Sequence, residues 1–429
     1  MLYAILQPLM RLALRIFFRK IYFSNAEVIP WGKPLIIASN HPTAFMEPLI
    51  YCSLLRQPLH SITRGDVFTR PFFGKILKSL YMVPIFRFKD GFGNLKLNNA
   101  SFEHCYQTLA DNKAILIFSE GRTKLEKRLR PIQKGTARMA FGTWESLGNT
   151  DLDIQIVPVG LNYVRGNCFR DEVMIRFDAP ISLREYEKMY HENPIRSVTK
   201  LTEELKNRLE KLVIIVADTN DDEFAEQLLI IRRNELYDGV LPIVSESNKR
   251  LEAEKRVADR ICQMSDDEKV FWKKETADYF KKLDENSIKD DILAKNIPIG
   301  WKNQTARVLG FLPATIGYIG NILPVSLAQR IANKRVSADH VEFFTPVLIG
   351  SSLLLYLIYY LFLLIFAGIF NQLIVWLCLL ILPFLGYYAV TYYEFNKKFE
   401  TANVLSKLNK TTVADLRLQR KFISRLEKI

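Results

Sequence analysis

Short apolar runs alternate with longer segments of helical periodicity over the first half of the chain. Apolar runs bounded by turn residues are typical of buried strands, and segments with a period near 3.6 are typical of helices. The pattern predicts strands at 34–39, 59–64, 113–118, 154–160 and 172–177, and helices at 95–109 and 135–147. Strands that alternate with helices pair into a parallel sheet. We therefore predict an α/β fold, a mostly parallel sheet flanked by helices.

The first residues of the chain have an amphipathic pattern. Arg11, Arg15 and Arg19 are four residues apart, so they share one helical face, opposite leucine and phenylalanine side chains. A signal peptide is the alternative, but here the charges follow the apolar start and no small-residue cleavage site appears. A basic stripe against a broad apolar face favours a helix that lies in the bilayer interface. We predict such an interfacial helix over residues 1–24.

A long uncharged stretch dominates the last third of the chain. No charged residue occurs between Glu342 and Glu394, which is too long for one spanning helix of about 20 residues. A break at 368–372 divides the stretch into spans near 346–367 and 373–393. A buried soluble core is the alternative, but such cores rarely contain so long an uncharged run. The stretch predicts a transmembrane hairpin.

Basic residues flank this hairpin on both outer sides, at Lys334, Arg335, Lys397 and Lys398. Basic flanks remain on the cytoplasmic side of a membrane, so both ends are expected there. We therefore predict a hairpin over 341–394 and a cytoplasmic tail over 395–429.

Two further segments precede the hairpin. Residues 186–300 are rich in Lys, Glu and Asp and predict a charged helical region. Between Arg307 and Arg330 there is no charge, but glycines and prolines interrupt the apolar run. A regular spanning helix is not expected there. A re-entrant or interfacial segment, or a pair of short helices, fits better, so 301–340 is predicted as an interrupted hydrophobic segment.

The formal net charge of +13 requires an anionic partner or surface. Nucleic acid is one candidate, but no aromatic-and-basic RNA motif, zinc finger or lysine-rich tail occurs. An anionic bilayer attracts the same excess charge, and the hydrophobic segments favour it, so we predict a membrane partner and no nucleic acid. The five cysteines are scattered, without a CxxC pair, which indicates a reducing cytoplasmic environment and no metal site.

A histidine follows the first predicted strand in the segment IIASNHPTAFMEPLI. Open α/β sheets place reactive groups just beyond strand ends. Glu47 lies six residues after His41, and a helix beginning near Pro42 or Thr43 would let its carboxylate meet the imidazole. A carboxylate on one ring nitrogen stabilises the positive charge when the other nitrogen takes a proton. No serine or cysteine stands in a nucleophile-elbow pattern, so the attacking group would be a hydroxyl of the acceptor.

Four more motifs follow in order: VPIFR, ending in Arg87; FSEGRTK, with Glu120, Gly121 and Arg122; the QKG stretch with Lys134; and the strand IVPVG. Arginine can donate two parallel hydrogen bonds to a phosphate. A glycine lets main-chain amides approach an anion closely. Each motif has an ordinary alternative, such as a surface ion pair, a basic turn or an apolar strand.

Together, NHPTAFME, VPIFR, FSEGRTK, IVPVG and the Lys134–Gly135 stretch resemble the glycerolipid acyltransferase family, which includes lysophosphatidic acid and glycerol-3-phosphate acyltransferases. The resemblance covers about residues 25–185, the expected acyltransferase domain. It implies His41 as general base, Glu47 as its partner, and substrate binding by Arg87, Glu120, Gly121, Arg122 and Lys134. It also implies direct transfer, with acyl-CoA or acyl-carrier protein as co-substrate and no cofactor.

The expected reaction moves a fatty acyl group to a hydroxyl of glycerol-3-phosphate or 1-acylglycerol-3-phosphate in phospholipid biosynthesis. The expected location is a membrane, the inner membrane if bacterial, in a multi-pass protein whose catalytic domain faces the cytoplasm. Alternatives are transfer to a lyso-aminolipid or other lysolipid, and an inactive membrane scaffold with the same fold.

Two positions depart from the family pattern. The family's carboxylate is usually Asp with four intervening residues, whereas Glu47 here has five. A longer spacing, a charged middle region and a C-terminal hairpin resemble the branch of dual-substrate glycerol-3-phosphate and dihydroxyacetone phosphate acyltransferases. The family's EGTR reads EGRT here, which moves Arg122 one position earlier.

Overall fold

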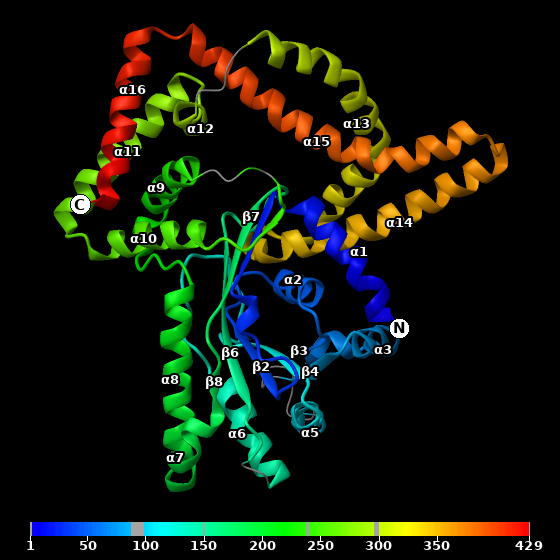
Figure 1. The fold of residues 1–429 in the computed structure, drawn as a ribbon, viewed down its shortest axis with the longest axis vertical. Coiled ribbons are helices and arrows are strands. Elements are labelled where there is room, and N and C mark those ends of the chain that lie inside the picture. The colour runs from blue at the N-terminus through cyan, green and yellow to red at the C-terminus, as the bar shows by residue number, and fades with distance from the viewer. Residues whose placement is uncertain are drawn as a thin grey trace. The chain divides into compact units, whose positions relative to one another are not determined.

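A mostly parallel sheet forms the centre of the first part of the chain in the computed structural model (Figure 1). The structure describes residues 2–86, 98–148, 151–236, 239, 241–295 and 300–428. The described strands are β1 (Lys20–Ser24), β2 (Leu35–Ser39), β3 (Leu59–Arg64), β4 (Met82–Ile85), β5 (Ala114–Phe118), β6 (Gln155–Tyr163), β7 (Glu172–Phe177), β8 (Ile181–Ser182) and β9 (Val244–Ser245).

The strand order is β4-β3-β5-β2-β6-β7-β1-β9, with β8 paired to β6. The pairs of β6 with β7 and with β8 are antiparallel, and the other described pairs are parallel. The predicted α/β fold is therefore confirmed. The five predicted strands correspond to β2, β3, β5, β6 and β7.

The register of the central strands brings their carboxyl ends to one edge of the sheet. Ser39, the last residue of β2, lies opposite Phe118 of β5 and Val159 of β6. The residues that follow these strands, including His41 and Glu120, therefore start from the same edge. This is the edge at which open α/β sheets place their ligands.

Helices cover both faces of this sheet, so every side chain of β2 is buried. On one face Ile36 and Ala38 belong to a core shared with α5 (Asn98–Ala110), α6 (Gly135–Leu147) and α8 (Pro194–Leu212). On the other face Ser39 bonds Tyr51 of α2 (Met46–Leu54), with 2.8 Å between the hydroxyl oxygens. Figure 1 shows α8 beside β6 and β8. This part of the chain also contains α3 (Pro71–Ser79) and α7 (Glu187–Glu192).

The predicted amphipathic helix is present as α1 (Leu2–Phe17). Ile5, Leu12 and Ile16 are exposed, which leaves an apolar face available to a bilayer interface. Arg11, a member of the predicted basic stripe, is bonded within the protein. Its Nε donates to the Ser53 carbonyl at 2.9 Å. That contact satisfies a carbonyl in the last turn of α2, which has no partner within its own helix.

The chain divides into two compact units. The first contains residues 1–215, 240–248 and 340–346, so it extends beyond the predicted domain at 25–185. Residues 240–248 join it because β9 pairs with β1, and residues 340–346 join it through hydrogen bonds to Ala44 and Gly166. Such long-range contacts have no local signal in the sequence.

The second unit consists of helices. They are α9 (Asp222–Glu235), α10 (Lys249–Gln263), α11 (Asp266–Glu285), α12 (Asp290–Ala294), α13 (Trp301–Arg335), α14 (Phe344–Phe370), α15 (Leu373–Lys407) and α16 (Lys410–Ile423), of which α14 begins within the first unit. Among the described residues, α13, α14 (with the turn before it) and α15 are long and apolar enough to cross a membrane.

The interrupted segment predicted at 301–340 is instead one helix, α13, which contains Pro313 and Pro324. Figure 1 shows that α13 is strongly bent. Pro324 lacks the N–H that the Gly320 carbonyl would accept. The hydroxyl of Tyr359 on α14 donates to that carbonyl at 2.7 Å. A neighbouring helix thus supplies the missing donor, which lets the helix continue through the proline.

Candidate active site

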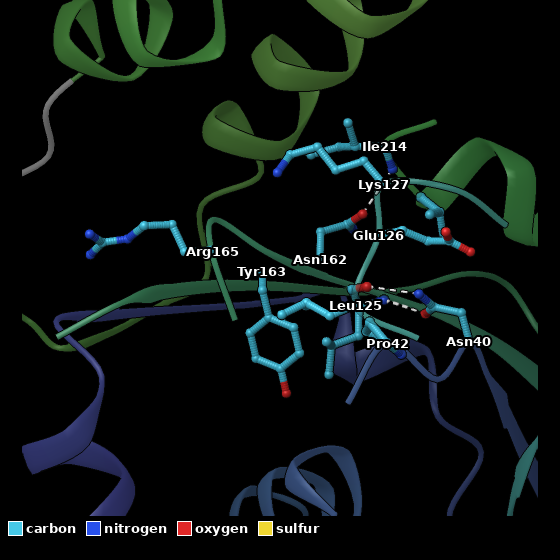
Figure 2. Close-up of a pocket in the computed structure, with 11 residues that line it drawn as sticks. Asn40, Pro42, Leu125, Glu126, Lys127, Asn162, Tyr163, Arg165 and Ile214 are labelled. Carbon is cyan, nitrogen blue, oxygen red and sulfur yellow. Dashed lines mark hydrogen bonds between the residues drawn. The ribbon is translucent and has the colours of Figure 1, made fainter. Parts of the chain in front are cut away.

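The loop after β2 is held in place by a buried asparagine. The Asn40 side chain donates from Nδ2 to the Leu161 carbonyl at 2.9 Å and accepts the Leu161 N–H at 2.8 Å. Figure 2 shows this pair of bonds reaching from the loop to β6. The two bonds satisfy a main-chain donor and acceptor of β6 at once, so they fix the backbone next to His41.

His41 and Glu47 form the centre of the site. Nδ1 of His41 lies 3.0 Å from Oε2 of Glu47, whose side chain is fully buried in the first turn of α2. Residues 42–45 form a bend before α2, and this bend takes up the longer spacing in the sequence. The predicted pairing of His41 with Glu47 is present in the structure, with Glu47 in the place of the family's usual Asp.

The second oxygen of Glu47 is held by three donors. Oε1 accepts the Thr43 N–H at 2.8 Å, the Thr43 hydroxyl at 2.6 Å and the Tyr163 hydroxyl at 3.2 Å. Hydrogen bonds to a carboxylate favour its charged form, and a buried charge needs such partners. Burial, with Glu47 next to it, raises the pKa of Tyr163 well above its usual range, so its hydroxyl remains a donor.

The imidazole of His41 is oriented by stacking as well as by Glu47. Its ring lies on Phe118, with 4.0 Å between centroids and 13° between planes. The side chain is 14% exposed. With Nδ1–H donated to the carboxylate, the neutral ring presents the lone pair of Nε2 as a proton acceptor.

Glu120 lies under the same loop. Its carboxyl is buried, and burial raises its pKa from 4.5 to about 7, against the opposing effects of the His41 main-chain N–H and Arg130. Because it accepts the His41 main-chain N–H, Glu120 helps to hold the backbone of the loop after β2. Gly121 follows with a φ of 67°, a left-handed conformation that suits glycine and turns the chain outward.

The basic candidate residues have different positions. Arg122 is exposed directly after Gly121. Lys134 precedes α6, and its Nζ donates to the Thr199 hydroxyl on α8 at 3.0 Å. Arg87 lies outside the described residues, so its predicted role stays a prediction.

A basic segment continues beyond Arg122. Among residues 122–130 there are five basic side chains and a single acidic one, Glu126. Glu126 lies 3.2 Å from Nζ of Lys124 and 3.1 Å from Nε of Arg130. Although burial acts in the opposite direction, these two cations hold the pKa of Glu126 below its usual value. One carboxylate thus organises a segment with a large positive excess, which is suited to an anion.

A cavity of about 100 Å³ lies between the loop after β2 and the basic segment at 122–130. Asn40, Pro42, Glu126, Lys127 and Arg165 are among its lining residues (Figure 2). His41 itself does not line it. Ligand pockets usually enclose about 300–1,000 Å³, so this cavity is too small for an acyl chain or a coenzyme.

Four side chains that support the site were not identified in the sequence: Asn40, Thr43, Phe118 and Tyr163. Asn40 and Thr43 lie beside His41, within the quoted motif, and proximity was their only signal. Phe118 and Tyr163 belong to β5 and β6, where they read as ordinary strand residues. Their roles depend on the pairing of both strands beside β2.

Comparison with known proteins identifies the domain. Residues 20–162 match the family described as Acyltransferase, so this part of the chain is an acyltransferase-family domain. Glycerol-3-phosphate O-acyltransferase 1 of Saccharomyces cerevisiae is 29% identical over 155 residues, which is 35% of this chain and 20% of that protein. An uncharacterized acyltransferase of Schizosaccharomyces pombe is 30% identical over 83 residues, 19% of this chain and 12% of that protein.

The match to the first curated relative therefore spans about a fifth of that relative's length. Among solved structures, the crystal structure of the 1-acyl-sn-glycerophosphate (LPA) acyltransferase of Thermotoga maritima matches with 15% identity and a TM-score of 0.30. That match covers 44% of this chain and 73% of the other.

Proposed function

We propose that this protein transfers a fatty acyl group from acyl-CoA or acyl-carrier protein to a hydroxyl of glycerol-3-phosphate or 1-acylglycerol-3-phosphate in phospholipid biosynthesis. One observation carries the proposal: Nδ1 of His41 lies 3.0 Å from a buried carboxylate that is itself held by three donors. This arrangement leaves Nε2 of His41 to act on a substrate hydroxyl at the edge of the sheet.

The proposed reaction needs one proton acceptor and no covalent enzyme intermediate. Nε2 of His41 takes the proton of the acceptor hydroxyl as its oxygen attacks the thioester carbonyl. The carbon–sulfur bond then breaks, and the departing thiolate receives the proton from the imidazolium. Glu47 stabilises that imidazolium while it exists. General base catalysis of this kind contributes about 10²–10⁴-fold to a rate.

The basic segment at 122–130 supports an acceptor that carries phosphate. Arg122 and Lys124 are exposed directly after the Glu120–Gly121 turn. This turn begins at Glu120, which is hydrogen-bonded to the His41 main chain. Cations close to the base would hold the phosphate of a small acceptor while its hydroxyl meets Nε2. The name of the Saccharomyces relative, glycerol-3-phosphate O-acyltransferase 1, agrees with this acceptor class.

We further propose that α14 and α15 cross the membrane as a hairpin and that α13 enters and returns on the side of the catalytic unit. Among the described residues before α13, no candidate span occurs. After α13, the Glu342 carbonyl accepts the Ala44 N–H of the catalytic unit at 3.3 Å. Both ends of α13 therefore belong on one side, which an odd number of crossings would not allow.

The chain after α15 supports the same topology. Arg420 of α16 donates to Asp290 of α12 at 2.9 Å, and Phe422 stacks on Trp272 with 5.0 Å between centroids. The tail is thus packed on helices that precede α13. The basic residues on both flanks of the hairpin favour the cytoplasm for this side.

A purified, membrane-reconstituted full-length protein tests the reaction. It would be incubated with labelled acyl-CoA or acyl-carrier protein and with glycerol-3-phosphate, dihydroxyacetone phosphate, lysophosphatidic acid or a lyso-aminolipid. We expect labelled product with a glycerol phosphate, a loss of about 10²-fold or more in His41→Ala, and normal activity in His191→Ala, an exposed histidine of α7. Normal turnover in His41→Ala would refute the mechanism.

A further inference from the structure

The short segment between α13 and α14 contacts the loop after β2, residues 40–45, which contains His41 and is called the catalytic loop below. Residues 340–346 belong to the first unit, although the rest of that unit ends at residue 248. The Glu342 carbonyl accepts the N–H of Ala44, with 3.3 Å between the atoms. Three residues further on, the Thr345 hydroxyl donates to the Gly166 carbonyl at 2.9 Å. The Thr345 residue is 1% exposed, so water does not compete for that carbonyl.

Both contacts adjoin groups that hold the His41–Glu47 pair. Ala44 stands between His41 and Glu47 in the bend before α2. Gly166 follows β6 three residues after Tyr163, whose hydroxyl donates to Glu47. The segment therefore contacts the bend on one side of Glu47 and the strand end on the other.

The contact with Ala44 also helps to accommodate the five residues between His41 and Glu47. The bend at 42–45 has main-chain donors that no regular element satisfies. Glu47 itself accepts the Thr43 N–H at 2.8 Å, and the next donor, on Ala44, is accepted by the Glu342 carbonyl. Unpaired main-chain donors favour alternative conformations. A partner for Ala44 therefore holds the bend in the shape that brings Glu47 to His41.

The turn at Gly166 is closed on its other side. Its N–H donates to Oδ2 of the buried Asp171 at 2.6 Å, and its φ is 83°. Thr345 then satisfies the carbonyl of the same residue. A turn fixed at both its donor and its acceptor holds the end of β6, and with it Tyr163, in one position.

We propose that residues 340–346 position the catalytic loop and join it to the first turn of α14. The segment acts through Ala44 and Gly166 on the His41–Glu47 pair and does not touch substrate. It therefore consists of positioning residues, with Thr345 as the member whose side chain can be changed cleanly. The inference rests on the proposed function, because it assigns the segment to the reaction of His41.

Thr345→Val and Thr345→Ser in the full-length, membrane-reconstituted protein test the role. Valine has nearly the same shape but no hydroxyl, whereas serine keeps the donor. We expect Thr345→Val to lower kcat about tenfold with little change in either KM, because misplaced catalytic groups lose rate before they lose binding. Thr345→Ser should keep kcat within about twofold of the unchanged protein. Rates are normalised to folded protein recovered in the membrane.

Ser351→Ala is the matched control, because its hydroxyl bonds the Val347 carbonyl within α14 and leaves the loop untouched. It should retain full kcat. Wild-type kcat in Thr345→Val would overturn the proposal, and so would equal losses in the Val and Ser variants. Failure of the proposed function is distinct, because His41→Ala would then be as active as the unchanged protein or no product would form at all.

Disulfide cross-linking gives a measurement that needs no activity. Ala44→Cys and Glu342→Cys, in a background whose five native cysteines are replaced by serine, should form a bond on oxidation. A main-chain hydrogen bond brings the two backbones together, and disulfides form only between backbones that lie close to each other. Efficient cross-linking supports the docking of the segment, and its absence in a folded protein would overturn it.

Discussion

Oε2 of Glu47 lies 3.0 Å from Nδ1 of His41, although five residues separate the two in the chain. The bend at 42–45 places Glu47 in the first turn of α2, where main-chain N–H groups and the helix dipole favour a carboxylate. The extra residue and the longer side chain therefore act together. The spacing of His41 and Glu47 departs from the family pattern in the sequence, but the two side chains still make contact in the structure.

Changing Glu47 tests that pair directly. Glu47→Gln keeps the size but removes the charge that stabilises the imidazolium, and we expect kcat to fall by about 10²-fold or more. Glu47→Asp keeps the charge but withdraws the carboxylate by one methylene, so a smaller loss is expected. Steady-state rates per folded protein give the comparison. Wild-type activity in Glu47→Gln would remove the carboxylate from the mechanism.

Tyr163→Phe removes one of the three donors to Oε1 of Glu47. We expect a modest fall in kcat, about three- to tenfold, because Thr43 still donates twice. Tyr51→Phe is the control, since its hydroxyl pairs with the Ser39 hydroxyl at 2.8 Å and is not among the three donors to Oε1 of Glu47. An equal loss in both variants would point to general damage of the core.

Glu120→Gln should change how stability depends on pH. Below pH 4.5 the carboxyl is protonated in the folded and the unfolded chain alike, so it has no effect. Between pH 4.5 and about 7 only the unfolded chain loses the proton, so the free energy of unfolding falls as the pH rises. The variant escapes this loss, which amounts to at most about 3 kcal/mol.

Thermal unfolding in detergent at pH 4 and pH 8 measures the effect. Glu120→Gln should unfold at a higher temperature than the unchanged protein at pH 8, and at a similar temperature at pH 4. Glu192→Gln, at an exposed residue of α7, should have no such dependence. A variant less stable at both pH values would show that the carboxyl stays charged.

Arg122→Ala tests the basic segment. If this side chain binds the acceptor phosphate, KM for glycerol-3-phosphate should rise about tenfold with little change in KM for the acyl donor. Arg56→Ala is the control, because Arg56 is exposed in the bend after α2, outside the basic segment. An unchanged KM would exclude Arg122 from acceptor binding.

The membrane topology can be read from single cysteines in sealed vesicles. Asn371→Cys lies between α14 and α15, and His340→Cys lies in the segment after α13. We expect an impermeant maleimide to label these two from opposite sides, with Lys410→Cys of α16 on the side of His340. Labelling of positions 340 and 371 from the same side would mean that α14 does not cross and would contradict the hairpin.

Local patterns determined the strands and helices around the site. The strand at 59–64 and the helix at 135–147 agree with β3 and α6 to the residue. Apolar runs and helical periods depend only on neighbours a few positions away, and burial of both faces makes them unambiguous. Glycine and proline misled the prediction at 301–340, because Tyr359 of another helix supplies the donor that keeps α13 continuous.

The sequence by itself determined that His41 follows a strand, that Glu47 comes six residues later, and that a long uncharged apolar stretch lies between Glu342 and Glu394. Only the tertiary structure decided that Glu47 reaches the ring, that Tyr163 and Thr43 fix it, and that residues 340–346 return to the loop. These contacts join positions up to about 300 residues apart, and their energy depends on strand order and register. No short window of sequence contains that information, because a hydrogen bond depends on where its partner lies in space.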